Sequence, residues 1–149
     1  MIKFKIVTPE RTVFEDSVTQ ATLPTADGEI TILPNHTSYI ASLIPGELMV
    51  RLASSDNAKD GEEVLLSTSG GFIEFHGNEL IVLADTAERA EEIDLARAQE
   101  GRKRAEELKS QRISLDEADY ARVAASIQKE SARIRVARKH YTKRGIKID

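Results

Sequence analysis

The C-terminal segment, residues 129–149, carries the side chains whose chemistry is clearest in this sequence. It holds eight basic and two acidic residues, the acids being Glu130 and Asp149. The basic residues are Lys129, Arg133, Arg135, Arg138, Lys139, Lys143, Arg144 and Lys147. A cluster of this kind favours binding to an acidic protein, to nucleic acid or to an anionic membrane surface. The alternative is a solvated helix face with no partner.

The charge of the chain is divided between two parts. The whole chain has a formal net charge of -4. Residues 1–85 hold 5 basic and 13 acidic side chains, a net of -8, whereas residues 86–149 hold 16 and 12, a net of +4. This division predicts two bodies with different partners. The acidic first body, and the lack of aromatic residues near the basic ones, weaken the nucleic-acid hypothesis.

Other chemistry is not indicated. The three histidines, His36, His76 and His140, lie in separate segments without ligand spacing, so we predict no metal site. No P-loop, nucleophile elbow or zinc-protease motif occurs, so we predict no catalytic residues. There is no cysteine, no signal peptide, and no apolar run near the roughly 20 residues that span a bilayer. These observations favour a cytoplasmic binding or regulatory protein rather than a self-contained enzyme.

Residues 1–85 are predicted to form strands. All four prolines lie there, and short runs such as Ile2–Ile6 and Leu48–Leu52 alternate apolar with other side chains. Period-two alternation is typical of half-buried strands, and eight to ten short strands indicate a sandwich or barrel. The polar segment Ser54–Glu63 is interpreted as a mobile hairpin loop.

Residues 86–149 are predicted to form two helices. Asp85 followed by Glu88 resembles an N-cap, and Ser114 followed by Glu117 fits a capping box. The short connection Ser110–Ile113 predicts an antiparallel pair. The fold class is therefore α+β, with a sandwich of about ten strands in residues 1–85 followed by an antiparallel two-helix hairpin in residues 86–149.

Small residues are expected where the two helices face each other. A stripe of small residues on the second helix is expected to meet a similar stripe on the first, and a separate apolar stripe needs another surface. The first helix offers Ala98, Gly101, Ala105 and Leu108. The second helix offers Ala118, Ala121, Ala125, Ala132 and Val136, and its separate stripe is Tyr120, Val123, Ile127, Ile134 and Tyr141. Because alanine buries little area, the pair is expected to be marginally stable alone and able to change partners.

Five motifs in order give the chain a resemblance to a known family. They are Gly28–His36, Leu43–Leu48, Ser69–Glu74, Val82–Glu88 and Arg133–Ala137. Together they resemble the epsilon subunit of F-type ATP synthase, and they extend over essentially the whole chain.

The resemblance implies a non-catalytic subunit of the central stalk of a proton-translocating ATP synthase. Its sandwich would dock on the gamma subunit and the c-ring, with Glu29 and His36 at this contact. The chain would lie at the cytoplasmic face of the cell membrane, held there only through the complex. No cofactor would be required.

The resemblance also implies a regulatory hairpin. Folded on the sandwich, the hairpin would permit ATP hydrolysis; extended along gamma, it would reach the alpha and beta subunits and block hydrolysis. Basic residues of the last helix would contact an acidic segment of beta. The candidates are Arg133, Arg135, Arg138 and Lys139.

Some relatives bind ATP on the folded hairpin, and this chain matches their motif in Ile93–Ala98. The resemblance therefore implies ATP as a regulatory ligand. The candidate residues are Glu88, Asp94, Arg97, Ala98, Lys129 and Arg133. Lys129 stands where those relatives have a second arginine, and lysine keeps the charge but loses the bidentate geometry. The alternative interpretations are an ion pair between Asp94 and Arg97 within the helix, a nucleotide sensor outside ATP synthase, and a nucleic-acid-binding module.

Overall fold

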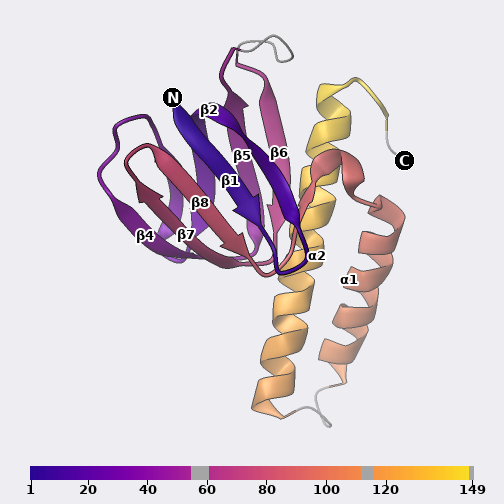
Figure 1. Ribbon diagram of the computed structural model, residues 1–149. Helices are drawn as coiled ribbons and strands as arrows, with labels where there is room; N and C mark the ends of the chain where they lie inside the picture. The colour runs from indigo at the N-terminus through magenta and orange to yellow at the C-terminus, as the bar shows by residue number, and fades with distance from the viewer. Residues whose placement is uncertain (55–60, 112–115, 148–149) are drawn as a thin grey trace.

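The structure is a computed structural model and describes residues 1–54, 61–111 and 116–147. Nine strands, one short 3-10 helix and two α-helices follow one another in these residues. The strands are β1 (Ile2–Val7), β2 (Thr12–Thr25), β3 (Gly28–Ile32), β4 (Tyr39–Leu43), β5 (Gly46–Leu52), β6 (Glu63–Thr68), β7 (Gly71–His76), β8 (Glu79–Ala84) and β9 (Ala87–Arg89). The helices are η1 (Ala90–Glu92), α1 (Leu95–Ser110) and α2 (Glu117–Lys143). The predicted α+β class, a sandwich followed by a helical hairpin, is confirmed (Figure 1).

The strands form two layers around one core. β1, β8, β7 and β4 pair in that order in one layer, and β5 lies between β2 and β6 in the other. The long strand β2 joins the layers, because its first half pairs with β1 and its second half with β3 and β5. Alternate side chains of every strand point inward, so both layers contribute to a continuous apolar core. Its largest fully buried side chains include Phe4, Phe75, Leu23, Leu48 and Leu66.

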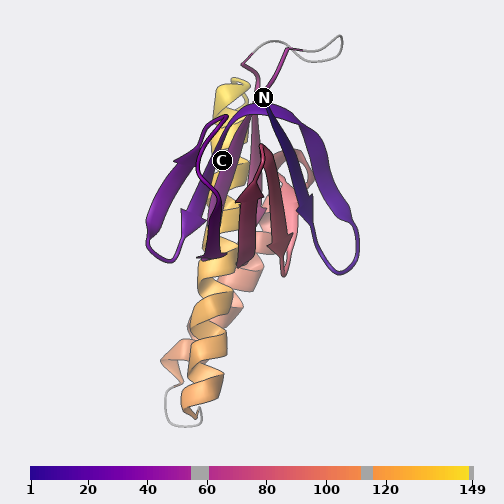
Figure 2. The ribbon, with the colours of Figure 1, turned by 60° about the vertical axis from the view of Figure 1, so that its left-hand side comes forward.

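The outer faces of the two layers differ. The C-terminal half of α2 lies along β5 and β6, whereas among the residues that the structure describes no helix lies over β4, β7 and β8 (Figures 1 and 2). Val136 and Ala137 of α2 are buried against Leu65 of β6 and Ile93. The other ends of α1 and α2 extend beyond the sandwich as a free antiparallel pair (Figure 1). The hairpin is therefore folded on the sandwich in this structure.

The first helix begins later than predicted. Residues 87–89 form β9, which pairs antiparallel with β6, and η1 follows before α1 begins at Leu95. The helix start predicted at Asp85–Glu88 is therefore wrong. The physical reason is that β6 would otherwise leave an unpaired edge, and β9 covers it. The sheet thus continues past residue 85, and the division into domains at 85 and 86 stays a prediction.

Both helices are capped by an aspartate. The Asp94 carboxylate accepts a hydrogen bond from the Arg97 backbone N–H, and Asp116 accepts one from Asp119. Such caps satisfy backbone donors that the helix itself leaves unpaired. The predicted cap at Ser114 lies outside the described residues. Residues 55–60 of the predicted hairpin loop lie outside them too.

The predicted stripes of the hairpin are correct only in part. Ala98 and Ala105 of α1 are buried, as is Ala132 of α2. Ala121 and Ala125, however, are exposed. Val136 does not face α1 but packs in the cluster with Leu65, Ala90 and Ile93, and Tyr141 packs there too. The sheet thus covers the second stripe only near Tyr141, whereas Tyr120 at the other end of the stripe is 38% exposed.

Within residues 1–54, 61–111 and 116–147, no helix is long and apolar enough to cross a membrane. Nor do three or more His, Asp or Glu side chains gather there where they could hold a metal ion.

Candidate functional site

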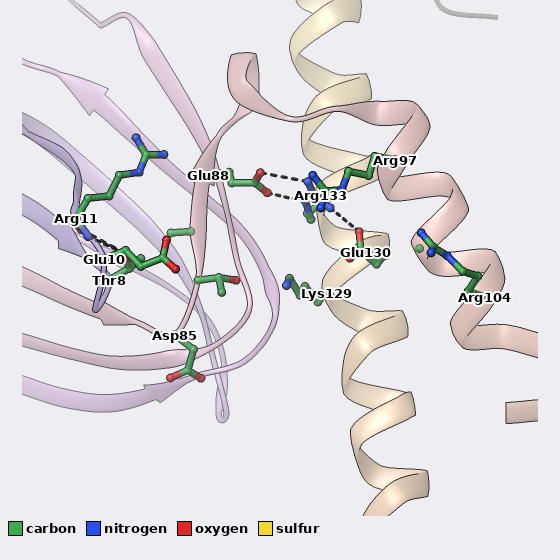
Figure 3. Close-up of a pocket in the computed structure, with 13 residues that line it drawn as sticks. Thr8, Glu10, Arg11, Asp85, Glu88, Arg97, Arg104, Lys129, Glu130 and Arg133 are labelled. Carbon is green, nitrogen blue, oxygen red and sulfur yellow. Dashed lines mark hydrogen bonds and ion pairs between the residues drawn. The ribbon is translucent and has the colours of Figure 1, made fainter. Parts of the chain in front are cut away.

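A cleft of about 520 Å³ lies where the hairpin meets the sandwich. Three parts of the chain line it: the β1–β2 turn, the segment that leads from β8 into β9, and the facing sides of α1 and α2 (Figure 3). The lining residues are Thr8, Glu10, Arg11, Asp85, Thr86, Ala87, Glu88, Arg97, Gly101, Arg104, Lys129, Glu130 and Arg133. Both the hairpin and the sandwich supply walls of the cleft, so its shape depends on how the hairpin packs on the sandwich.

Arg133 joins the two bodies at one wall of the cleft. Its Nε and Nη2 donate to the Glu88 carboxylate at 2.6 and 3.1 Å, and its Nη1 donates to Glu130 at 2.8 Å (Figure 3). Only 12% of the Arg133 side chain is exposed. Burial opposes the charge, but the hydrogen bonds with Glu88 and Glu130 outweigh it and raise the pKa of Arg133. Arg133 is therefore a fully charged residue whose guanidinium nitrogens are all engaged.

Three other cations line the cleft without a carboxylate partner. Arg97 and Arg104 come from α1 and Lys129 from α2, and within residues 1–54, 61–111 and 116–147 none of them forms an ion pair. Between the two arginines lies Gly101, against which the Glu130 side chain packs; a Cβ at residue 101 would lie 3.2 Å from Glu130 Cδ. Uncompensated positive charge therefore gathers on the helical side of the cleft.

The structure brings together four of the six predicted ATP-binding residues. Glu88, Arg97, Lys129 and Arg133 line the same cleft. Asp94 and Ala98 do not: the Asp94 carboxylate caps α1 by bonding the Arg97 backbone N–H at 3.0 Å, and Ala98 is fully buried. The predicted side-chain pair of Asp94 and Arg97 is thus replaced by a helix cap. ATP binding itself stays a prediction.

The four candidates for an inhibitory contact fall into two groups. Arg133 and Lys139 are bound to the sandwich, Arg133 by Glu88 and Lys139 by Glu47 of β5. Arg135 and Arg138 are exposed and form no ion pair with any residue that the structure describes. In the folded hairpin, two of the four cations are therefore already neutralised.

Two more ion pairs connect the hairpin region to the sandwich. Lys143 at the end of α2 binds Glu63 of β6, and Arg11 of the β1–β2 turn binds Glu92 at 2.9 Å. The hydrogen bond from Lys143 lowers the pKa of the Glu63 carboxyl, against partial burial and with help from Arg51. The hydrogen bond from Arg11 similarly lowers the pKa of Glu92, again against partial burial. Both contacts are therefore strongest when these carboxyls are ionised.

Glu29 and His36 are not brought into one turn. Glu29 follows Gly28 at the start of β3, and His36 lies beyond the other end of that strand. The His36 ring packs edge-on against Phe75, with ring centroids 5.9 Å apart. The preceding Asn35 adopts a left-handed φ of 65° and exchanges two hydrogen bonds with the Asn78 side chain. The two predicted contact residues thus lie at separate places on the sandwich, and their role stays a prediction.

Sequence reasoning missed several residues of these surfaces. Arg104 and Glu130 line the cleft, and Glu47 and Glu63 hold the end of α2. The helical spacing of Arg97, Gly101 and Arg104 was the available signal, since positions i, i+4 and i+7 share one face.

Sequence reasoning also missed a set of large apolar side chains on the layer that contains β4, β7 and β8. Ile40, Phe72, Ile81 and Leu83 are exposed on β4, β7 and β8. Register brings them together: Phe72 is paired with Leu83, and Ile40 and Ile81 are both paired with Glu74. They form an apolar patch that we call the open face. The available signal in the sequence was the alternation along each strand, which places these side chains on the side opposite the core.

The fold defines a small protein in which a β-sandwich carries a C-terminal helical hairpin. Residues 1–90 match the family described as ATP synthase, Delta/Epsilon chain, beta-sandwich domain. The ATP synthase epsilon chain of Chloroflexus aggregans is 42% identical over 143 residues, 96% of each chain. That of Dehalococcoides mccartyi is 40% identical over 138 residues, 93% of each chain. The chain therefore belongs to the ATP synthase epsilon chain family.

Solved structures share the fold. A chain of the Euglena gracilis mitochondrial ATP synthase structure, which contains OSCP, F1 and the c-ring, superposes with a TM-score of 0.72. The match covers 88% of this chain and 78% of that one at 21% sequence identity. A chain of the Tetrahymena thermophila mitochondrial ATP synthase central stalk and c-ring gives a TM-score of 0.57 at 19% identity. At this level of identity the likeness concerns the fold.

Proposed function

We propose that this chain is a non-catalytic subunit of the central stalk of a proton-translocating ATP synthase. Its sandwich binds the gamma subunit and the c-ring, and its hairpin regulates ATP hydrolysis by the alpha and beta subunits. The complex holds it at the cytoplasmic face of the membrane. Family membership supports this assignment, and the single structural observation that carries it is the open face.

The open face is suited to a protein partner. α2 covers the outer face of β5 and β6, but Phe72 remains 60% exposed and Ile40 74% exposed on the other layer. Contiguous apolar side chains of this size mark interaction surfaces, because their burial contributes roughly 25 cal/mol per Å². Glu74 lies among them and lets the face stay hydrated until it is covered. We assign this face to gamma.

The hairpin is proposed to act through its basic side chains. In the folded state, carboxylates of the sandwich hold Arg133, Lys139 and Lys143. If the hairpin extends, these cations lose their partners and become available to an acidic segment of beta. Folding the hairpin back thus competes with inhibition for the same charges.

Reconstitution tests this proposal. The full chain should copurify with gamma and should lower ATP hydrolysis by an alpha–beta–gamma complex. A chain ending at residue 94, which retains β9 and η1, should still bind gamma but should not lower hydrolysis. Failure of the full chain to bind gamma would contradict the proposed role. Equal inhibition by both chains would contradict only the regulation by the hairpin.

A second function, ATP binding, is supported by the cleft. Glu88, Arg97, Lys129 and Arg133, named from the sequence, line it together. We propose that ATP binds there and stabilises the folded hairpin, because a ligand held by both walls favours the state in which both walls meet. Calorimetry with the full chain and with Arg97→Gln tests this proposal. Absence of heat with millimolar ATP would exclude it.

A further inference from the structure

Methionine is rare in this chain, and one of its two copies lies where the hairpin meets the sandwich. The whole sequence contains Met1, Met49 and no cysteine. Met1 is 73% exposed at the N-terminus, whereas Met49 lies in the middle of β5 and is partly buried. Of the two sulfur-containing side chains, that of Met49 is thus the one that packs against the hairpin.

The side chain of Met49 lies on the outer face of β5, beneath α2 (Figure 1). Its neighbours in the strand, Leu48 and Val50, are fully buried in the core of the sandwich, so alternation places Met49 on the opposite face. There it packs against a cluster of five buried aliphatic residues from the sheet, from η1 and the residue after it, and from α2. They are Leu65, Ala90, Ile93, Val136 and Ala137. Met49 therefore contributes directly to the apolar contact that holds α2 against the sheet.

Ion pairs lie on both sides of Met49 along the same face of β5. Glu47, two residues before it, binds Lys139 of α2. Arg51, two residues after it, binds Glu63, and the same carboxylate binds the last residue of α2. Partly exposed pairs of this kind contribute little stability each. The docking of the end of α2 therefore depends largely on the apolar contact between them.

The thioether of Met49 can be oxidised, which the hydrocarbon side chains around it cannot. A sulfur lone pair attacks one oxygen of hydrogen peroxide, so that an S–O bond forms and the O–O bond breaks. The proton of the transferred hydroxyl combines with the released hydroxide to give water. The sulfur loses two electrons, which reduce the peroxide, and the product is a polar sulfoxide. Because Met49 is only partly buried, peroxide can reach its sulfur.

A sulfoxide at residue 49 would place a hydrogen-bond acceptor against the aliphatic cluster. The five buried side chains of the cluster carry no donor that could satisfy it. Burying a polar group without a partner is unfavourable, whereas water hydrates the sulfoxide once α2 moves away from the sheet. Oxidation therefore favours the state in which α2 has left the sheet.

From this position we infer that Met49 is an oxidative modification site, at which a peroxide releases α2 from the sandwich. The release depends only on the packing of Met49, whereas its effect on ATP hydrolysis rests on the proposed function. In that function the released basic side chains become available to beta, so oxidation lowers hydrolysis. Methionine sulfoxide reductases, one for each epimer of the sulfoxide, reverse the modification.

Treatment of the purified full chain with hydrogen peroxide, followed by removal of the peroxide with catalase, tests the inference. Peptide mass mapping measures the oxidation of Met1 and Met49 separately, and hydrogen exchange measures the protection of backbone amides. In wild type we expect both methionines to be oxidised and the C-terminal half of α2 to lose protection about tenfold or more. Amides of β7, in the other layer, should keep their protection. Treatment with both sulfoxide reductases should restore the protection of α2.

Met49→Leu is the matched control. Leucine keeps the volume and the apolar character of the side chain, so the folded arrangement should remain. Met1 is still oxidised in this variant, but α2 should keep its protection after peroxide. Met49→Gln places a polar amide at the same position without any oxidant, and it should loosen α2 before treatment.

Three results would overturn the inference. The first is full oxidation of Met1 without oxidation of Met49, and the second is oxidised Met49 with unchanged protection of α2. The third is an equal loss of protection in oxidised Met49→Leu, because the effect would then arise elsewhere in the chain.

A last measurement separates the inference from the proposed function. The oxidised chain is added to an alpha–beta–gamma complex that has not been exposed to peroxide, and we expect it to lower ATP hydrolysis more than the untreated chain does. If oxidation loosens α2 but hydrolysis is lowered no further, the role of Met49 stands and the regulation by the hairpin is contradicted.

Discussion

The guanidinium of Arg133 on α2 binds the carboxylate of Glu88 on β9 through two hydrogen bonds, 2.6 and 3.1 Å long, across 45 residues of sequence. The same pair lines the cleft and joins the hairpin to the sandwich. Regulation by a mobile hairpin and binding in the cleft are therefore physically coupled in the proposed function, because separating the two bodies breaks this pair and opens the cleft.

Glu88→Gln should loosen the folded hairpin. The substitution keeps the shape of the side chain but removes the charge that Arg133 faces, and we expect a loss of about 1–3 kcal/mol in the stability of the folded arrangement. Hydrogen exchange of the backbone amides of α2 measures it. Glu79→Gln, which removes the exposed pair with Lys3, is the control. Equal protection of α2 in both variants would contradict the role of Glu88.

Acid should weaken the contact between the end of α2 and the sandwich. The pKa of Glu63 is lowered in the folded protein, chiefly by Lys143, so its stabilising contribution is complete above the unfolded value of about 4.3. This contribution is lost as the pH falls through the lower, folded-state pKa. Hydrogen exchange or a distance probe on α2 between about pH 7 and pH 3 should show this loosening. Glu63→Gln should reduce the pH dependence; an unchanged profile would assign it to other groups, such as Glu92.

Phe72→Ser should weaken binding to gamma without destabilising the chain itself. Phe72 is 60% exposed, so its replacement costs the isolated protein little. In the proposed complex it would be buried, and we expect a loss of about 1–3 kcal/mol in affinity, roughly ten- to a hundredfold. Ile146→Ser, an exposed apolar residue far along the chain from the open face, is the control. If Phe72→Ser binds gamma as tightly as wild type, the open face is not the docking surface.

Exchanging the charges of Glu47 and Lys139 distinguishes two effects of Lys139: the docking of α2 on the sandwich and the proposed inhibition of ATP hydrolysis. Lys139→Glu should loosen the end of α2 by placing two carboxylates together, and the double variant Glu47→Lys with Lys139→Glu should restore the contact, with a coupling of about 0.5–1 kcal/mol. Protease resistance of α2 measures docking, and ATP hydrolysis measures inhibition. Inhibition should stay reduced in the double variant, because position 139 would then repel an acidic partner. Full recovery of inhibition would remove Lys139 from the proposed contact with beta.

The sequence by itself was sufficient to predict the order of the two parts of the fold, a β-sandwich followed by a helical hairpin. Alternation in runs such as Ile2–Ile6 predicts strands, and the proline-free segment after residue 86 predicts helices, because these periods are properties of neighbouring residues. The division of charge predicts two bodies. The resemblance also predicts four residues of the cleft, which are Glu88, Arg97, Lys129 and Arg133.

Only the tertiary structure decided which contacts these residues make. Glu88 follows an apparent helix signal but lies in β9, because an open edge of β6 is covered by pairing with it. Asp94 has the spacing of a side-chain pair with Arg97 but caps the helix. The partners of Lys139 and Lys143 are Glu47 and Glu63, 92 and 80 residues away in the chain. Such choices depend on how separate elements pack, and local sequence patterns contain no information on distances between elements far apart in the chain.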